Sequence, residues 1–229
     1  MRNLKDDMVL EVISLMESCS GLLLLHFEIH NTYGVFNPIT GEFQLVPNNQ
    51  HGGPIGLAVD SSTQSYRLVA VDVKQNLTNW EKKVFKFMTF TSSSCMWEEA
   101  HEEELVCELP TFLTRNALPI FLRNSMNWLI NDGSILAFDL ERRRARIIKG
   151  PNKTTVDVKF EYDVWFGAVQ DSLVFVRAFE SEIVIYVYDC VQKKWQILHT
   201  IENISRGEGN YFTQNASKGA QAQSTERNV

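Results

Sequence analysis

The sequence alternates large apolar residues with smaller or polar ones at a period of two, in short runs that end at turn-forming residues. Six of these runs occupy residues 22–27, 66–73, 84–90, 134–138, 173–179 and 183–188, and they are rich in Val, Ile, Leu, Phe and Tyr. Short β-branched and aromatic segments bounded by Gly, Asn, Asp, Ser or Pro are typical of strands. The pattern predicts an all-β protein.

The run at residues 183–188 (IVIYVY) is apolar at every position, so both faces of that strand are apolar. Such a strand needs cover on both sides of its sheet, which predicts stacked sheets. Residues 4–16 also fit a helix, with Leu4, Met8 and Val12 on one stripe and Asp6 or Asp7 as its cap. The second half of that segment fits a strand as well, and both interpretations remain open.

A short motif recurs four times, with an Asn or Asp at the end of one strand and an aromatic position six residues later. The Asn or Asp stands at positions 37, 60, 139 and 189. The aromatic is Phe43, Tyr66 or Trp195, and the third copy has Ala145 instead. An Asn or Asp side chain can bond the backbone two residues on and start a turn. Each copy therefore predicts a β-hairpin.

Two such hairpins make a unit of roughly 40 to 50 residues, which is the size of one propeller blade. Residues 121–149 resemble half a blade, and residues 165–198 repeat the same order of strands and turns. The predicted fold is a β-propeller-like stack of short antiparallel sheets. The core has room for about four blades of roughly 45 residues each, so we expect an incomplete or truncated propeller.

Charge and hydropathy exclude several classes of protein. The longest apolar runs fall far short of the roughly 20 residues that cross a bilayer, and charged residues interrupt the amino terminus where a secretory signal would be apolar. Lys and Arg total 22 against 28 Asp and Glu, a net charge of −6, which disfavours binding to nucleic-acid phosphates. We expect a soluble protein of the cytoplasm, the nucleus or both, without membrane or nucleic acid as a partner.

No cluster of residues predicts catalysis, a cofactor or a metal site. The four cysteines lack the spacing of zinc ligands and are expected to be reduced. They are Cys19, Cys95, Cys107 and Cys190. His26 and His30 would lie on one sheet face but far from each other, so a metal pair is not expected. Residues 91–95 (TSSSC) lack the G-x-S-x-G pattern of a hydrolase and predict a hydroxyl-rich turn.

Two charge runs are candidates for a binding surface. Their members are Glu98, Glu99, Glu102, Glu103, Glu104 and Glu108, around His101, and Arg142, Arg143, Arg144, Arg146 and Lys149. Exposed runs are ordinarily solvated loops or strand edges that discourage aggregation. The functional alternative is that both runs lie on one rim of the propeller and steer a charged partner.

Five segments follow one another in order: SCSGLLLL at residues 18–25, VFNPITGEF at 35–43, VDSSTQSYRLV at 59–69, NWL at 127–129 and ILAFDLE at 135–141. All but the segment at 59–69 resemble, in order, the elements S-C-x-G-L-L, W-N-P-x-T, H-W-L and I-L-A-F-D-L-x-x-E of the F-box-associated domain of plant F-box proteins. That domain is a kelch-like β-propeller. The resemblance covers most of residues 18–200.

The resemblance implies a non-catalytic interaction module, the substrate-recognition domain of a cullin-based, SCF-type E3 ubiquitin ligase, with an unknown protein substrate as partner. Family members carry a helical F-box ahead of the propeller, and residues 1–17 do not resemble one. We expect a lead segment at residues 1–17, the propeller-like domain at 18–204 and a disordered polar tail at 205–229. Ligase adaptor binding is expected only if an F-box is supplied.

Two alternatives remain open. A glycan-binding or enzymatic β-propeller would use convergent loop residues such as Trp97, His101 and Trp165 as its pocket. A non-functional fragment of an F-box gene would have no partner. The sequence assigns no individual partner-binding residue, because function on such scaffolds lies in the loops.

Overall fold

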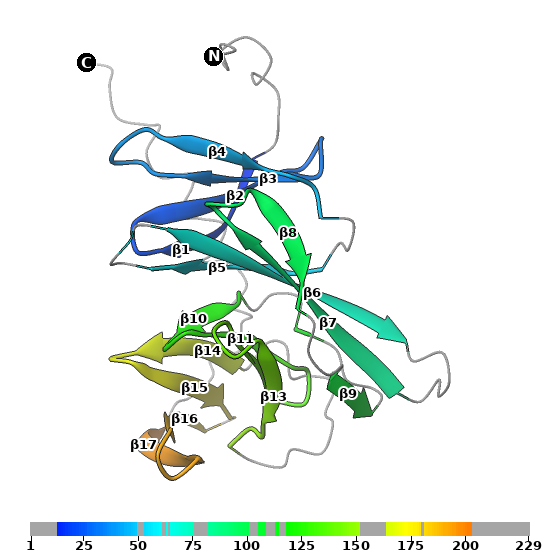
Figure 1. The fold of residues 1–229 in the computed structure, drawn as a ribbon. Helices are drawn as coiled ribbons and strands as arrows, with labels where there is room; N and C mark the ends of the chain where they lie inside the picture. Colours follow the sequence, from blue (N-terminus) through cyan, green and yellow to red (C-terminus); the bar gives the residue numbers. More distant parts are fainter. Residues whose placement is uncertain are drawn as a thin grey trace, which may run out of the picture.

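The computed structural model describes residues 13–49, 53–60, 63, 65–75, 82–100, 105–108, 113–114, 118–151, 164–179 and 181–202. Within these ranges the chain forms seventeen strands in four antiparallel sheets (Figure 1). None of the described segments is a helix able to cross a membrane. The all-β prediction is confirmed.

Each sheet is one blade, and its strands follow one another in chain order. Blade 1 contains β1 (Ile13–Cys19), β2 (Leu22–Phe27), β3 (Thr32–Phe36) and β4 (Phe43–Val46). Blade 2 contains β5 (Ile55–Val59), β6 (Tyr66–Gln75), β7 (Lys82–Thr91) and β8 (Met96–Glu99), and β9 (Leu105–Glu108) also pairs with β7. Blade 3 contains β10 (Ile120–Leu122), β11 (Ser125–Leu129), β12 (Ile135–Asp139) and β13 (Arg144–Ile148). Blade 4 contains β14 (Val164–Val169), β15 (Ser172–Ala178), β16 (Glu182–Asp189) and β17 (Lys194–Glu202).

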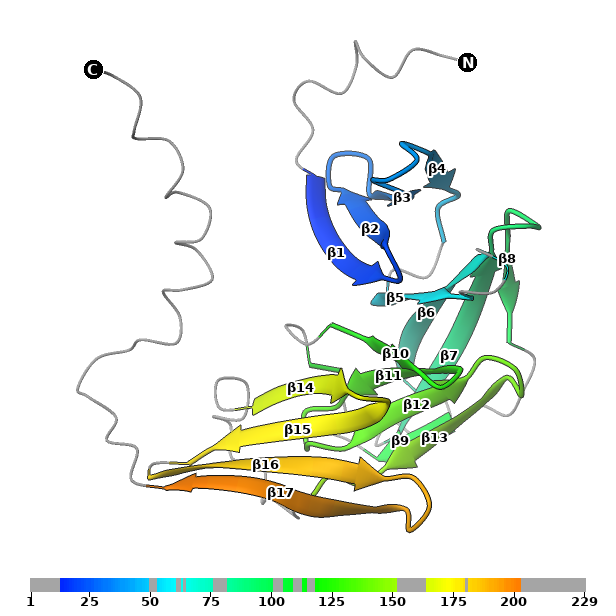
Figure 2. The ribbon, with the colours of Figure 1, turned by 90° about the vertical axis from the view of Figure 1, so that its left-hand side faces the viewer.

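The blades stack through their first strands. β1 contacts β5, β5 contacts β10, and β10 contacts β14. Figure 2 shows the resulting fan, with blade 1 at one end and blade 4 at the other. This is the arrangement of an incomplete propeller, as the sequence predicts.

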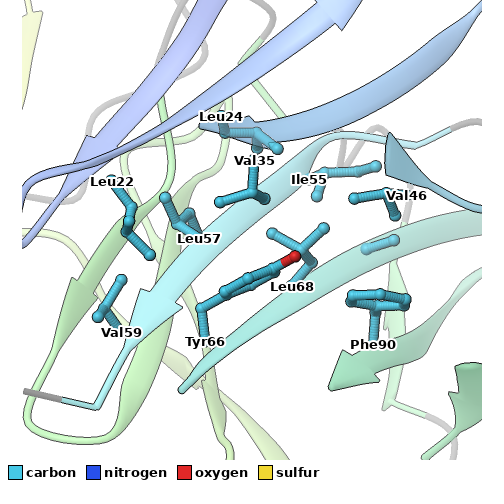
Figure 3. Packing of buried hydrophobic residues seen from close by; sticks show 11 residues of the cluster. Leu22, Leu24, Val35, Val46, Ile55, Leu57, Val59, Tyr66, Leu68 and Phe90 are labelled. Carbon is cyan, nitrogen blue, oxygen red and sulfur yellow. The ribbon is translucent and has the colours of Figure 1, made fainter. Parts of the chain in front are cut away.

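Apolar side chains from facing sheets fill each gap between blades, which we call a seam. Leu24 packs with Leu57 in the seam between blades 1 and 2 (Figure 3). In the seam between blades 2 and 3, Phe87 stacks on Phe138 with ring centroids 4.5 Å apart. Burying a large apolar side chain contributes roughly 1.5–3 kcal/mol. A single small sheet is marginal by itself, so stacking stabilises each blade.

The six predicted strands all coincide with observed strands: residues 22–27 match β2, and the others lie within two residues of β6, β7, β12, β15 and β16. The helix interpretation is wrong for residues 13–16, because pairing of β1 with β2 outweighs the helical spacing. Residues 1–12 and the predicted tail at 205–229 lie outside the described residues. The first strand begins at Ile13, ahead of the expected start of the domain at residue 18.

The sequence pattern predicts half a blade at residues 121–149, but these residues form nearly a whole blade. The strand that the sequence pattern does not predict there is β10, which has only three residues and is defined by its backbone pairing with β11. The β13 strand begins within the arginine run and follows the predicted hairpin turn at Asp139.

Three copies of the repeated motif occupy the hairpin between the third and fourth strands of blades 1, 3 and 4. The Oδ1 atoms of Asn37, Asp139 and Asp189 accept bonds from backbone N–H groups two and three residues on, at 2.8–3.3 Å. The copy at Asp60 instead lies between the first and second strands of blade 2. The corresponding hairpin of blade 2 has Thr91 and, six residues later, Trp97.

Candidate functional site

A pocket of about 260 Å³ opens where blades 2 and 3 meet. The β5–β6 hairpin of blade 2 forms one side, and the β10–β11 and β12–β13 hairpins of blade 3 form the other. We call it the rim pocket, and its lining residues are Ala58, Val59, Asp60, Ser65, Arg67, Phe121, Asn124 and Leu140.

Backbone hydrogen bonds hold the hairpins around the rim pocket. The N–H of Asp60 donates to the Ser65 carbonyl at 2.9 Å and closes the loop between β5 and β6. On the opposite side, the Leu140 N–H donates to the Asn124 carbonyl at 2.9 Å, which ties the two hairpins of blade 3 together. The Asn124 side chain also donates to the Glu141 carboxylate at 3.3 Å. The walls of the pocket are therefore fixed by bonds within each blade.

The lining of the rim pocket combines an apolar base with polar edges. Val59 and Leu140 are each 6% exposed and belong to the packed cores of the seams. Asp60, Arg67 and Asn124 are exposed, so they supply a carboxylate, a guanidinium and an amide at the mouth. Such a site can accept an apolar group while the edge residues bond its polar neighbours.

The two charge runs meet across the seam between blades 2 and 3. The Nη2 atom of Arg143 donates to the Glu99 carbonyl at 3.0 Å, and its Nη1 atom lies 3.8 Å from a Glu98 carboxylate oxygen. Lys86 Nζ lies 3.8 Å from the Glu99 carboxylate. The runs therefore partly neutralise one another. This differs from both sequence interpretations, because each of those treated the two runs as facing solvent or a partner.

Arg142 of the basic run does not take part in this contact through its ion pair, which lies within its own hairpin. Its Nη1 atom is 3.6 Å from the Asp139 carboxylate, and 79% of the Arg142 side chain is exposed. His101 and Glu102–104 lie outside the described residues, as does the side chain of Glu108. Sequence inspection could not pair the runs, since about 44 residues separate Arg143 from Glu99.

The aromatic pocket considered in the sequence is not formed by its two described tryptophans. Trp97 lies on β8, packs on Phe90 and donates its indole N–H to the Pro47 carbonyl at 2.7 Å. Trp165 lies on β14 of blade 4 and is 52% exposed. The two residues are on blades that do not neighbour each other, so they cannot converge on one ligand.

The histidine and hydroxyl-rich segments have local structural roles. His26 stacks on Tyr33 with ring centroids 4.7 Å apart, and its Nε2 atom lies 3.1 Å from Asn31 Oδ1. Residues 91–95 form the predicted turn between β7 and β8, where the Cys95 N–H donates to the Thr91 carbonyl at 2.9 Å. Among the described residues, no group of three or more His, Cys, Asp or Glu is arranged to hold a metal.

One buried carboxyl was not singled out from the sequence. Glu17 on β1 is 8% exposed, and one of its oxygens accepts a bond from the Leu57 N–H at 2.6 Å. Burial raises the pKa of Glu17 from 4.5 to about 8, and the bond from Leu57 only partly opposes that rise. An acidic residue two positions before the end of a short strand carries no sequence signal of burial, because its burial depends on blade 2.

Tyr66 completes the polar contacts of the same seam. Its hydroxyl donates to the Gln44 side-chain carbonyl at 2.6 Å, across from blade 2 to blade 1. Burial raises the pKa of Tyr66 to about 12, so the phenol stays a neutral donor. Glu17 and Tyr66 therefore act as contacts between blades, away from the rim pocket.

Comparison with family models gives no match, but curated relatives share much of the sequence. A putative F-box protein of Arabidopsis thaliana is 26% identical over 212 residues, which is 82% of this chain and 49% of the relative. Two putative F-box/kelch-repeat proteins of Arabidopsis thaliana are 30% and 28% identical, over 59% and 82% of this chain and 32% and 49% of their own lengths. The chain thus spans about a third to a half of these relatives.

Solved structures overlap with the chain only loosely. A chain from a nidogen/laminin complex aligns at 10% identity and a TM-score of 0.44, over 80% of this chain and 59% of its own length. Dipeptidyl peptidase 4 of Porphyromonas gingivalis aligns at 8% identity and a TM-score of 0.47, over 82% of this chain and 32% of its own length. Overlaps of this size carry no information about binding or catalysis.

The order of the five motifs, the relatives and the stacked sheets agree with one another. The motif segments become β1–β3, β5–β6 and β11–β12, which are strands and turns of three successive blades. The relatives extend the similarity over most of the chain. The chain is therefore similar, over most of its length, to F-box and F-box/kelch-repeat proteins of Arabidopsis thaliana.

Proposed function

We propose that this chain is a protein-interaction module that holds a protein target in the cytoplasm or the nucleus. In this proposal it is the non-catalytic substrate-recognition part of a cullin-based, SCF-type ubiquitin ligase. The names of the Arabidopsis relatives, F-box and F-box/kelch-repeat proteins, support this role. Adaptor binding would be supplied by an F-box joined to the propeller.

The size and lining of the rim pocket carry the proposal. Its volume of about 260 Å³ is below the roughly 300–1,000 Å³ of small-molecule and cofactor sites. A space of this size suits one side chain of a protein partner, anchored over Val59 and Leu140. Arg67 and Asp60 then lie at the edge, where polar contacts set orientation and specificity more than affinity.

The experiment compares target capture by three purified proteins: the wild-type chain, Arg67→Glu and Lys194→Glu. Lys194 is an exposed cation at the start of β17, so its reversal changes net charge equally but leaves the rim pocket intact. Proteins enriched from plant extracts are identified by mass spectrometry, then purified and titrated against each variant by calorimetry. We expect at least about a tenfold loss of affinity for Arg67→Glu, which is 1.4 kcal/mol, and none for Lys194→Glu.

A second measurement tests the ligase role. The chain is fused to an F-box, and ubiquitination of the calorimetrically verified target is followed with the assembled ligase. We expect modification with the wild-type fusion and a marked loss with the Arg67→Glu fusion. Equal binding of every target by Arg67→Glu would contradict the rim pocket as the interface. A bound target that the fusion never modifies would contradict the ligase role alone.

A further inference from the structure

Every seam of the fan joins two sheet faces of different kinds. The back face of a blade, defined as the face toward the following blade, packs on the front face of that following blade. In the seam between blades 2 and 3, Val69 and Phe87 of the back face meet Trp128 and Phe138 of the front face. All four side chains are at most 6% exposed. Back and front faces are thus complementary halves of one apolar contact.

Blade 4 carries a back face that no described strand covers. Register places Trp165, Val176, Ile185 and His199 side by side across the four strands of this face. The parallel row contains Gly167, Val174, Val187 and Gln196. Trp165 is 52% exposed, and Val169 and Ile201 on the same face are 53% and 43% exposed. The indole of Trp165 lies over Gly167, where even a Cβ atom would collide with it.

Blade 1 carries the matching front face, also without a covering strand among those described. Register places Leu15, Leu25, Gly34 and Leu45 in one row of this face. The neighbouring row contains Leu23, Phe36 and Phe43. Leu15 is 61% exposed and Leu45 is 58% exposed, whereas the equivalent front face of blade 2 has Ile55, Leu57 and Leu68 at 0–2%.

Both uncovered faces lack charged side chains in these rows, although 22% of the residues of the chain are charged. Contiguous apolar patches without charge mark interaction sites, because exposing them to water is unfavourable. Burying them would not require any ion to be desolvated. The occupant of each face should therefore itself be an apolar sheet face.

One chain cannot pair these two faces with each other. Blade 1 and blade 4 share no extensive contact between their described strands, and Figure 2 shows them at opposite ends of the fan. A second copy supplies both missing faces at once. Blade 1 of the second copy covers blade 4 of the first, and blade 4 of the second copy covers blade 1 of the first. A two-fold arrangement of this kind is closed and does not extend into a filament.

We propose that the back face of blade 4 docks on the front face of blade 1 of a second copy of this chain, continuing the seams of the fan across a two-fold dimer. The contact repeats the pairing already seen three times within one chain. It uses Trp165 and Val169 from one copy and Leu15 and Leu45 from the other.

The test measures the mass of the full 229-residue chain by sedimentation equilibrium and by light scattering, from micromolar to sub-millimolar concentration. We expect twice the 26.3 kDa mass of one chain. Trp165→Glu, Val169→Glu and Leu45→Glu should each give the mass of one chain. The controls Ile39→Glu and Val191→Glu lie in exposed hairpins, at 87% and 91% exposure, and should remain dimeric. Far-ultraviolet circular dichroism identifies any variant that has failed to fold.

Mixing two monomeric variants tests which faces pair. Trp165→Glu retains an intact blade 1 face and Leu45→Glu retains an intact blade 4 face, so their mixture can form one undamaged seam. We expect the mixture to regain part of the dimer mass, while either variant alone stays monomeric. A dimer of Leu45→Glu alone would show that blade 4 pairs with blade 4 and would overturn the proposed contact. A wild-type chain that stays monomeric at every concentration would overturn the dimer itself.

Discussion

Different side-chain contacts cross the seam between blades 1 and 2 and the seam between blades 2 and 3, although the sheets stack in the same way. In the first, Trp97 donates its indole N–H to the Pro47 carbonyl at 2.7 Å, and the buried carboxyl of Glu17 meets the Leu57 N–H. In the second, Arg143 donates to the Glu99 carbonyl at 3.0 Å beside the Glu98 carboxylate. A neutral tryptophan thus bridges the two blades in the first seam, and a partly exposed arginine bridges them in the second.

The difference follows from one position of the repeated hairpin. Six residues after Thr91 the chain has Trp97, and six residues after Asp189 it has Trp195, which donates to the Lys149 carbonyl at 2.7 Å. Both tryptophans thus reach back to the connection that leaves the preceding blade. Blade 3 has Ala145 at this position, which cannot reach, and Arg143 of the same hairpin makes a cross-blade contact instead. The contributions of these contacts to the free energy of unfolding should therefore depend differently on pH and salt.

The largest expected effect is the pH dependence of the seam between blades 1 and 2. Because burial raises the pKa of Glu17 to about 8, the folded state holds the proton more tightly than the unfolded state. The stability that the neutral carboxyl of Glu17 contributes is therefore fully present below the unfolded pKa of 4.5. It is lost as the pH rises through about 8. We expect the free energy of unfolding to fall by on the order of 3 kcal/mol across that window, measured by urea titration.

Glu17→Gln should remove most of this pH dependence, because the amide oxygen still accepts the Leu57 N–H but carries no titrating proton. Glu42→Gln, at an exposed position in the β3–β4 hairpin, is the matched control and should keep the wild-type pH profile. If Glu17→Gln and the wild type lose stability in parallel between acidic and neutral pH, another group causes the loss.

An intermediate effect is expected from removing each indole N–H. Trp97→Phe and Trp195→Phe keep an aromatic ring in the seam but leave the Pro47 or Lys149 carbonyl without its donor. Each should lower the free energy of unfolding by about 1 kcal/mol, with little dependence on salt, as measured by urea midpoints at constant slope. Val191→Ala is the control, because Val191 is 91% exposed in the β16–β17 hairpin. An equal loss in all three variants would contradict a specific role for the bonds between blades.

The smallest effect is expected at Arg143, whose side chain is 35% exposed. Arg143→Ala should lower the free energy of unfolding by about 0.5–1 kcal/mol, and added NaCl should reduce the difference from wild type. Arg143→Gly should cost less, since the backbone there has φ = 55°, a value that Gly adopts without strain.

The control for that comparison is Arg142→Ala, because 79% of the Arg142 side chain is exposed and it pairs within its own hairpin. Its stability should stay close to that of the wild type. If the stability lost in Arg143→Ala does not depend on salt, packing of the aliphatic part of the Arg143 side chain, and not its charge, stabilises the contact between the blades.

Much of the fold could be predicted from the sequence, because strands and hairpins depend on neighbouring residues. Alternation located six strands to within two residues, and Asn37, Asp139 and Asp189 correctly indicated hairpin turns. The copy at Asp60 also forms the predicted hairpin, although it joins the first two strands of its blade and not the last two. The same local pattern missed β10, where three residues are too few to show a period.

Much less of the candidate site could be predicted, because its parts are distant in the sequence. Arg67 of blade 2 and Asn124 of blade 3 carry no motif, yet both line the rim pocket. The charge runs were visible as runs, but their mutual contact was not. Trp97 and Trp165 were singled out as partners in a pocket, whereas the structure places them on separate blades.

The sequence by itself determined the all-β class, the blade as the repeating unit and the similarity to F-box proteins, since each depends on residue order and local periodicity. Only the tertiary structure decided which faces meet, which carboxyl is buried and where a pocket opens. The physical reason is that a strand pattern shows that a face is apolar but not what will cover it. Glu17 and Arg143 are both ordinary charged residues in the sequence, and the stacking of the blades alone makes one a buried acid and the other a fastening between sheets.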